Sequence, residues 1–317
     1  SNDDIFELAD LPQSLLVIGS GVIGLELGQA MHRLGVRVCI LSRHSIGLLE
    51  DPAMVATARD LFRRELDLVS GYQLHGVERC DQGAAVHFSD AAGQPRREIF
   101  QRVLIATGRK PNLGGLDLAA AELVTDAEGQ LPHDHFTMRV EDSNVFLAGD
   151  VCGHRALLHE AAEEGKIAGG NAARYPECLA QPRTVPLAIA FTEPQMATLG
   201  APWSELGCDE SHVGEVDYRN QGRARVMNRN AGRVRIYGEA GTGKLQGAEM
   251  LGPGVEHTAH LLAWAVQQGL TVTEVLAMPY YHPVLEEGIR SALQDLRARL
   301  HIAQAPGSHC EEFGPGD

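Results

Sequence analysis

The sequence has little positive charge, no long apolar run and no segment that resembles a signal peptide. Its 317 residues carry 27 Lys and Arg against 42 Asp and Glu, a formal net charge of −15. This balance argues against nucleic acid and anionic membranes as partners. No apolar run approaches the ~20 residues that a membrane-spanning helix needs. We therefore expect a protein that neither crosses a membrane nor binds nucleic acid.

Close pairs of cysteines are also missing. The six cysteines stand at positions 39, 80, 152, 178, 208 and 310, without a C-x-x-C motif. This scatter favours reduced thiols and a cytoplasmic location over a disulfide framework or a zinc site. The pairs His133/His135 and His257/His260 lack the third and fourth ligands of a metal site, so we expect no metal. The length and the 44% hydrophobic content predict about two to three globular domains.

One stretch organises the rest of the chain, from Ser14 to Met31. Residues 15–18 form a short apolar run that is typical of a strand buried on both faces. A helix is expected from Leu25 to Leu34. Between the two lies G-x-G-x-x-G, at residues 19–24, in the strand–turn–helix context that a dinucleotide-binding motif requires.

Each glycine of this motif has its own physical reason. Gly19 allows the tight turn, Gly21 lets a pyrophosphate approach the backbone, and Gly24 lets the helix and the strand pack closely. The free N–H groups and the positive dipole end of the helix then face the phosphates. The pattern predicts a dinucleotide site; a purely structural glycine turn is the alternative.

A second strand, Val36 to Leu41, completes a β-α-β unit, and its end is where the two nicotinamide cofactors are usually told apart. An acid there accepts a hydrogen bond from the ribose 2′-hydroxyl, whereas an arginine pairs with a 2′-phosphate. Here Ser42 and Arg43 follow the strand, with no acid in place. The residues favour NADP, but Arg43 can also be a solvated loop residue, so NAD and NADP both stay open.

The remaining pattern predicts several further elements and a terminal tail. Expected are helices at 51–66, 159–174, 256–268, 272–277 and 286–300; strands at 73–79, 84–88, 98–100, 103–106 and 144–148; strands and turns over 185–250, including 233–237 and 245–251; and a frayed tail at 303–317. Residues 238–244 imitate the start of a P-loop, but a strand follows instead of a helix, so we predict a hairpin turn. Taken alone, Asp150 is expected to be an exposed turn residue.

Several segments together resemble the flavin-dependent pyridine nucleotide–disulfide oxidoreductases, and within them most closely the dihydrolipoamide dehydrogenases. The matching segments, in the family's order, are VIGSGVIGLELG (17–28), VLIATGRKPN (103–112), VFLAGDV (145–151), HEAAEEG (159–165), LGPGVEH (251–257) and HPVLEE (282–287). The resemblance implies an α/β Rossmann-type NAD(P)-binding domain at 1–112. It further implies the C-terminal part of an FAD-binding domain at 113–182 and an α+β dimerisation domain at 183–302.

The resemblance also implies roles for individual residues. Gly19, Gly21 and Gly24 would hold the nicotinamide dinucleotide, and Glu26 would lie near its nicotinamide end. Ser42, Arg43 and Gly108 are further candidates for cofactor binding. Asp150 would hold the ribitol of FAD, which replaces its interpretation as a turn residue. His282 and Glu287 match the family's catalytic dyad, which works in the active site of the neighbouring subunit, so a homodimer is expected. Without the resemblance, His282 before Pro283 would be a structural loop histidine.

The chain departs from the family in what it lacks, and Ser42 and Arg43 also depart from the acid typical of the NAD-using members. The family carries a first G-x-G-x-x-G for FAD and a C-x-x-x-x-C redox pair ahead of the region present here, and this sequence contains neither. We expect the C-terminal two-thirds of a longer protein, which binds a nicotinamide cofactor and dimerises but does not turn over as given.

The expected activity passes electrons between a nicotinamide, FAD, a redox disulfide and a small dithiol substrate, with dihydrolipoamide favoured. The alternatives are an NADPH-dependent disulfide reductase of the glutathione reductase type and a non-catalytic nucleotide-binding and dimerisation module. Mercuric reductase is disfavoured because Cys310 stands alone near the C-terminus.

Overall fold

The computed structural model describes residues 2–43, 45–207 and 209–303. Its contacts divide the chain into two units: unit 1, Ser1–Thr107 with Val185–Asp317, and unit 2, Gly108–Thr184. The tail predicted at 303–317 lies, apart from Ala303, outside the described residues. No helix in the described ranges is long and apolar enough to span a membrane.

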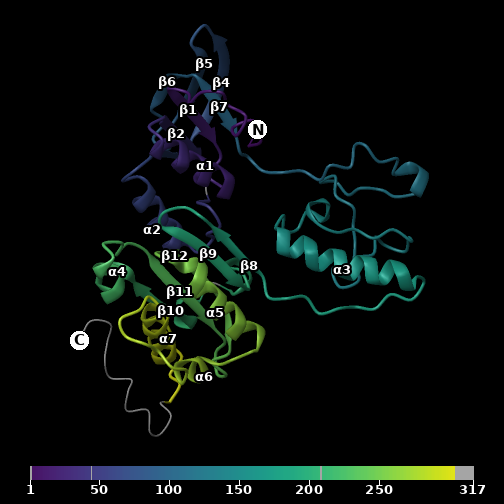
Figure 1. The fold of residues 1–317 in the computed structure, drawn as a ribbon, viewed down its shortest axis with the longest axis vertical. Helices are drawn as coiled ribbons and strands as arrows, with labels where there is room; N and C mark the ends of the chain where they lie inside the picture. Colours follow the sequence, from purple (N-terminus) through teal and green to yellow (C-terminus); the bar gives the residue numbers. More distant parts are fainter. Residues whose placement is uncertain (1, 44, 208, 304–317) are drawn as a thin grey trace. The chain divides into compact units, whose positions relative to one another are not determined.

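The first part of unit 1 contains a four-stranded parallel sheet in the order β3-β2-β1-β7. Figure 1 labels the strands β1, β2 and β7 of this sheet. Its strands are β1 (Ser14–Ile18), β2 (Arg37–Ser42), β3 (Asp67–Ser70) and β7 (Arg102–Ile105). Helix α1 (Val22–Arg33) connects β1 to β2, and α2 (Pro52–Phe62) connects β2 to β3. The predicted β-α-β unit is therefore confirmed.

Both faces of this sheet are buried, as the apolar run in β1 predicts. Leu15 and Val17 pack with residues of α1 and α2 on one face. Leu16 and Ile18 pack on the other face against an antiparallel meander. Its strands are β4 (Gln73–Cys80), β5 (Gly83–Ser89) and β6 (Pro95–Phe100). Since successive side chains of a strand point to opposite faces, one short run supplies two cores.

The second part of unit 1 is built on a five-stranded antiparallel sheet in the order β10-β11-β12-β9-β8. The strands are β8 (Leu187–Ala190), β9 (Gln195–Gly200), β10 (Val213–Asp217), β11 (Arg233–Gly238) and β12 (Leu245–Gly252). The helices are α4 (Gly222–Val226), α5 (Val255–Gln267), α6 (Val272–Leu276) and α7 (Glu287–Arg299).

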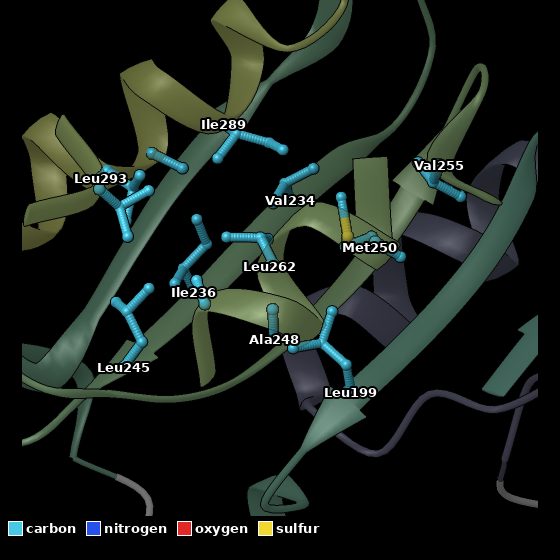
Figure 2. Close-up of a cluster of buried hydrophobic side chains, with 14 of the residues drawn as sticks. Leu199, Val234, Ile236, Leu245, Ala248, Met250, Val255, Leu262, Ile289 and Leu293 are labelled. Carbon is cyan, nitrogen blue, oxygen red and sulfur yellow. The ribbon is translucent and has the colours of Figure 1, made fainter. Parts of the chain in front are cut away.

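The two faces of this second sheet differ in chemistry. Figure 2 shows Val234 and Ile236 of β11 in one apolar cluster with Leu262 of α5 and Leu293 of α7. The alternate residues along β11 and β12 point the other way and are buried as well. They include Arg235, Tyr237 and Glu249, together with the apolar Leu251. This second face therefore buries charged groups, which must be paired to be tolerated.

Unit 2 contains the helix α3 (Leu158–Arg174) packed on irregular segments around its own apolar cluster. Arg183, near the end of unit 2, forms ion pairs with three carboxylates of α3. Its guanidinium lies 2.6 Å from Glu160, 2.9 Å from Glu163 and 3.3 Å from Glu164. Arg183 and its three carboxylate partners therefore join the end of this unit to its main helix.

The strand predicted at 144–148 is wrong. This segment forms a single bridge, between Arg139 and Phe146, and no strand. An apolar run becomes a strand only when a neighbour is available for pairing along its length. Within unit 2, Leu147 is instead buried in the cluster beneath α3, and the other apolar side chains of the run pack against it partly buried.

Two helix boundaries also differ from the predictions. The helix predicted at 51–66 ends at Phe62, and the strand β3, which no pattern suggested, follows at Asp67. Helix α1 begins at Val22 rather than Leu25, because Gly21 is its N-cap. The hairpin turn predicted at 238–244 is confirmed, since it joins β11 to β12.

Candidate functional site

Two of the three motif glycines are required by the protein's own packing. Gly19 has a φ of +113°, and a Cβ placed on it would lie 2.3 Å from the carbonyl oxygen of Ala106 at the end of β7. A Cβ on Gly24 would lie 2.1 Å from the carbonyl oxygen of Gly19. Both distances are far below van der Waals contact. Any side chain at either position would therefore push the glycine-rich loop out of place.

Gly21 is different, because a Cβ placed on it would meet nothing within 4 Å. Its φ of −68° is one that any residue adopts. Gly21 is also the N-cap of α1, no side chain caps this helix end, and the first turn carries no acid. Open space over an uncapped helix N-terminus suits a phosphate group. The residues therefore fit the pyrophosphate of a dinucleotide, which a Cβ on Gly21 would obstruct.

Ser42 is fully buried and does not face solvent. Its Oγ lies 2.7 Å from Ser20 Oγ, and both hydroxyls lie within hydrogen-bonding distance of the carbonyl oxygen of Ser45, at 3.1 and 2.7 Å. One hydroxyl thus donates to the other, which donates to the carbonyl. In addition, Gly47 N–H donates to the Ser20 carbonyl over 2.7 Å. These bonds join the glycine-rich loop to residues 43–51, which we call the β2–α2 loop.

Arg43 is exposed at the start of the β2–α2 loop. Its guanidinium forms no hydrogen bond or ion pair with any residue that the structure describes. An unpaired guanidinium at the carboxyl end of the second parallel strand is free to meet an anionic ligand.

Glu26 lies on α1 and is half-buried. Its Oε1 accepts a hydrogen bond of 2.6 Å from the backbone N–H of Phe191, just after β8. The residue predicted to approach the nicotinamide is thus also bound to the second sheet of the same unit.

The other predicted cofactor residues lie in unit 2. Gly108 follows β7 with a φ of +125° and has open space around it. Asp150 starts a short 3-10 helix, is exposed, and receives an ion pair of 3.0 Å from Arg109 through its Oδ2. Among the described residues no partner contacts its other oxygen, which is available to a hydroxyl group.

His282 and Glu287, which were proposed as a catalytic dyad, lie in contact with each other. His282 Nδ1 lies 2.9 Å from Glu287 Oε1, while Glu287 Oε2 accepts a 3.0 Å hydrogen bond from Val284 N–H. A carboxylate only accepts, so the neutral imidazole carries its proton on Nδ1 and has its lone pair on Nε2. The imidazole side chain is 66% exposed and Glu287 only 16%. A fixed carboxylate thus orients an accessible base.

Two buried thiols in the described part of the chain, Cys39 and Cys152, do not have the character of a reactive thiolate. Cys39, Cys80, Cys152 and Cys178 are free. Burial raises the pKa of the Cys39 thiol and, together with the nearby Glu164 carboxylate, raises the pKa of Cys152 to about 12. Both of these thiols therefore remain protonated at neutral pH, unlike a nucleophilic cysteine.

Histidine rings gather in unit 2 without forming a metal site. The ring of His135 lies 4.8 Å from that of His133 and 5.0 Å from that of His154, measured between centroids. Across the described ranges, no group of three or more His, Cys, Asp or Glu residues is arranged to hold a metal ion.

Sequence reasoning missed the buried charges beneath the β2–α2 loop. Asp51 is the N-cap of α2, and its Oδ2 lies 2.6 Å from Arg235 Nε and 3.1 Å from the hydroxyl of Tyr237. Glu249 accepts hydrogen bonds from the N–H groups of Glu50 and Asp51. Two signals were available: Asp51-Pro52 is typical of a helix start, and Glu249 is a charge inside an apolar strand.

Comparison with known proteins identifies the class. The chain belongs to the pyridine nucleotide-disulphide oxidoreductase family, whose model matches residues 1–165. The model of that family's dimerisation domain matches residues 186–293. The parallel Rossmann-type sheet and the antiparallel sheet described above are these two parts.

Individual relatives refine this picture. The chain is 30% identical over 297 residues to dihydrolipoyl dehydrogenase 2 of Haloarcula marismortui. The match covers 92% of this chain and 62% of the relative. The chain is 32% identical over 292 residues to a mercuric reductase of Acidithiobacillus ferrooxidans, covering 90% and 51%. The crystal structure of LpdA from Mycobacterium tuberculosis superposes with a TM-score of 0.77 at 26% identity, covering 92% and 63%. The chain thus spans about three-fifths or less of the length of these relatives.

Proposed function

We propose that the chain is the nicotinamide-binding and dimerising part of a flavin-dependent disulfide oxidoreductase. The reaction passes electrons between a nicotinamide, FAD, a redox disulfide and a dithiol, with dihydrolipoamide as the favoured substrate. The observation that carries this proposal is the contact between His282 Nδ1 and Glu287, which leaves Nε2 exposed. A protein that only bound nucleotides would need no oriented, solvent-facing base.

The dyad suits thiol chemistry. A neutral imidazole takes a thiol proton through Nε2, and the carboxylate of Glu287 stabilises the imidazolium that forms. The backbone bond from Val284 N–H fixes the second oxygen of Glu287, so the carboxylate cannot rotate away. In the proposed homodimer His282 serves the partner's active site, while flavin and nicotinamide, when bound, supply the hydride chemistry.

Among the remaining residues, Gly21 is proposed to receive the nucleotide pyrophosphate, and Asp150 to accept a hydrogen bond from a ribitol hydroxyl of FAD through its uncontacted oxygen. The first assignment is supported by the open space at Gly21 and the uncapped helix end, and the second by a carboxylate oxygen of Asp150 that no described residue contacts.

The dyad is tested with His282→Ala in the complete gene product, assayed for dihydrolipoamide oxidation. We expect kcat to fall by about 10²–10⁴-fold with unchanged thermal stability, because general base catalysis is lost while the side chain supports little packing. The matched control is His257→Ala, an exposed histidine 3.6 Å from Glu256 in the same domain. Dithiol oxidation that is unaffected by His282→Ala would overturn the catalytic role and favour the binding-module alternative.

An NADPH-dependent disulfide reductase of the glutathione reductase type is the second candidate, favoured by the unpaired Arg43. A charged hydrogen bond to a 2′-phosphate predicts that Arg43→Ala weakens NADPH binding by about 10-fold or more. NADH binding should change little. Equal losses for the two nucleotides in fluorescence titrations would make Arg43 a solvated loop residue.

A further inference from the structure

The β2–α2 loop, residues 43–51, begins at Arg43 and ends on side chains of the dimerisation domain. Glu249 Oε1 on β12 accepts hydrogen bonds of 3.0 Å from Glu50 N–H and 3.1 Å from Asp51 N–H. The side chain of Asp51 is held in turn by Arg235 and Tyr237 on β11. Glu249 and Arg235 are each only 3% exposed, so these are desolvated contacts.

The middle of the loop packs against both domains. Met196 of β9 packs so closely on Gly47 that a Cβ there would lie 2.6 Å from its methyl group. Ile46 and Leu49 are fully buried in a cluster that includes Met196 and Leu251. The loop that begins at Arg43 is thus held from two sides, by Ser20 of the nucleotide-binding domain near its start and by Met196 and Glu249 of the dimerisation domain farther along.

We propose that Glu249 is a positioning residue for nucleotide discrimination: by holding the backbone of Glu50 and Asp51 from the dimerisation domain, it places Arg43 against the 2′-phosphate. This inference rests on the proposed pairing of Arg43 with that phosphate. It assigns part of the cofactor preference to a carboxylate that has no contact with the nucleotide-binding motif.

The electrostatic surroundings make this anchor sensitive to pH. Burial raises the pKa of Glu249 to about 7. The hydrogen bonds from the two backbone N–H groups lower this pKa, and the nearby carboxylates of Asp51 and Glu50 raise it. The other titratable or charged groups of the network are Tyr237 and Arg235 on β11, and Glu210 and Glu215, which pair with Arg235. With the loop detached, a hydrated Glu249 would ionise near its ordinary value of 4.5. Raising the pH through 7 therefore favours detachment.

The test measures dissociation constants for NADPH and NADH in the 317-residue chain and four variants: Arg43→Ala, Glu249→Ala, Arg43→Ala with Glu249→Ala, and Glu239→Gln. Glu239 is the control, an exposed carboxylate beside β11 that bonds only Thr242 within the described residues. We expect Glu249→Ala to weaken NADPH about 10-fold and NADH about 3-fold or less, with Glu239→Gln unchanged. In the Arg43→Ala background, the additional Glu249→Ala substitution should not change the ratio of the NADPH and NADH dissociation constants further, because the two residues act through one contact.

The possible failures are distinguishable. If Arg43→Ala weakens both nucleotides equally, the proposed cofactor preference fails. If Arg43→Ala is selective but Glu249→Ala leaves the NADPH/NADH ratio at its wild-type value, the preference stands and the positioning role of Glu249 is overturned.

A second variant covers the case in which Glu249→Ala does not fold. Glu249→Gln keeps an acceptor oxygen but does not titrate. The ratio of the NADPH affinity of the wild-type chain to that of Glu249→Gln should fall by about 3-fold or more between pH 6 and pH 8. The 2′-phosphate titrates equally with both proteins, so its effect cancels in this ratio. A constant ratio between wild type and Glu249→Gln across this range would overturn the proposal.

Discussion

The loops that follow the neighbouring strands β1 and β2 are fixed in opposite ways. The loop after β1 is shaped by its own glycines, with Gly24 against Gly19 and Gly19 against the end of β7. The loop after β2 is fixed at its far end by Glu249, which lies 199 residues from Glu50 along the chain. The first loop can be recognised in the sequence as a motif, whereas the second depends on a partner that no local pattern identifies.

The largest expected effect comes from adding a methyl group to the first loop. Gly24→Ala places a Cβ 2.1 Å from a backbone oxygen and should cost about 3 kcal/mol or more of stability. Gly21→Ala meets nothing in the protein, so the midpoint of thermal unfolding should stay unchanged while nucleotide affinity falls. Thermal unfolding together with NADH titration of both variants separates the two roles. A Gly21→Ala chain that binds nucleotides normally would contradict the assignment of the pyrophosphate site.

A comparable change at the end of the second loop is Asp51→Ala. It removes the N-cap of α2 and a buried partner of Arg235, so we expect a loss of about 3 kcal/mol in the free energy of unfolding. Asp209→Ala serves as the control, because Asp209 caps a short 3-10 helix at the surface, and its loss should be well under half as large. Chemical denaturation measures both, and equal losses would show that the contacts across the two domains add nothing to the cap.

The smallest effect concerns the titration of Glu249. Because its folded-state pKa of about 7 lies above the ordinary value of 4.5, its contribution to stability is complete below pH 4.5 and is lost as the pH rises through 7. We expect a loss of roughly 2 kcal/mol between pH 5 and pH 8 that Glu249→Gln does not show. Urea denaturation across this range measures the difference. Parallel curves for the two proteins would mean that Glu249 does not titrate in the folded state.

The sequence predicted much of the fold because its signals are local. The alternating burial of β1, the G-x-G-x-x-G turn and the β11–β12 hairpin each depend on residues close together in the chain. The run at 144–148 shows where such reasoning fails, because pairing decides whether an apolar run becomes a strand. For the candidate site, the glycines and the His282–Glu287 pair could be proposed from spacing and resemblance, while the burial of Ser42 could not.

By itself the sequence determined the class of protein and the glycine-rich turn, and it led to the proposed roles of that turn and of His282 and Glu287, since backbone conformation and side-chain type are properties of short segments. Only the tertiary structure decided which neighbours hold those segments in place. Ser42, which was expected to bind the cofactor, is buried in the folded protein. Glu26 accepts a hydrogen bond from the backbone of Phe191, and Glu249 accepts hydrogen bonds from the backbone of Glu50 and Asp51. The reason is that desolvated polar groups must find partners, and the fold supplies them from whichever strand packs nearest.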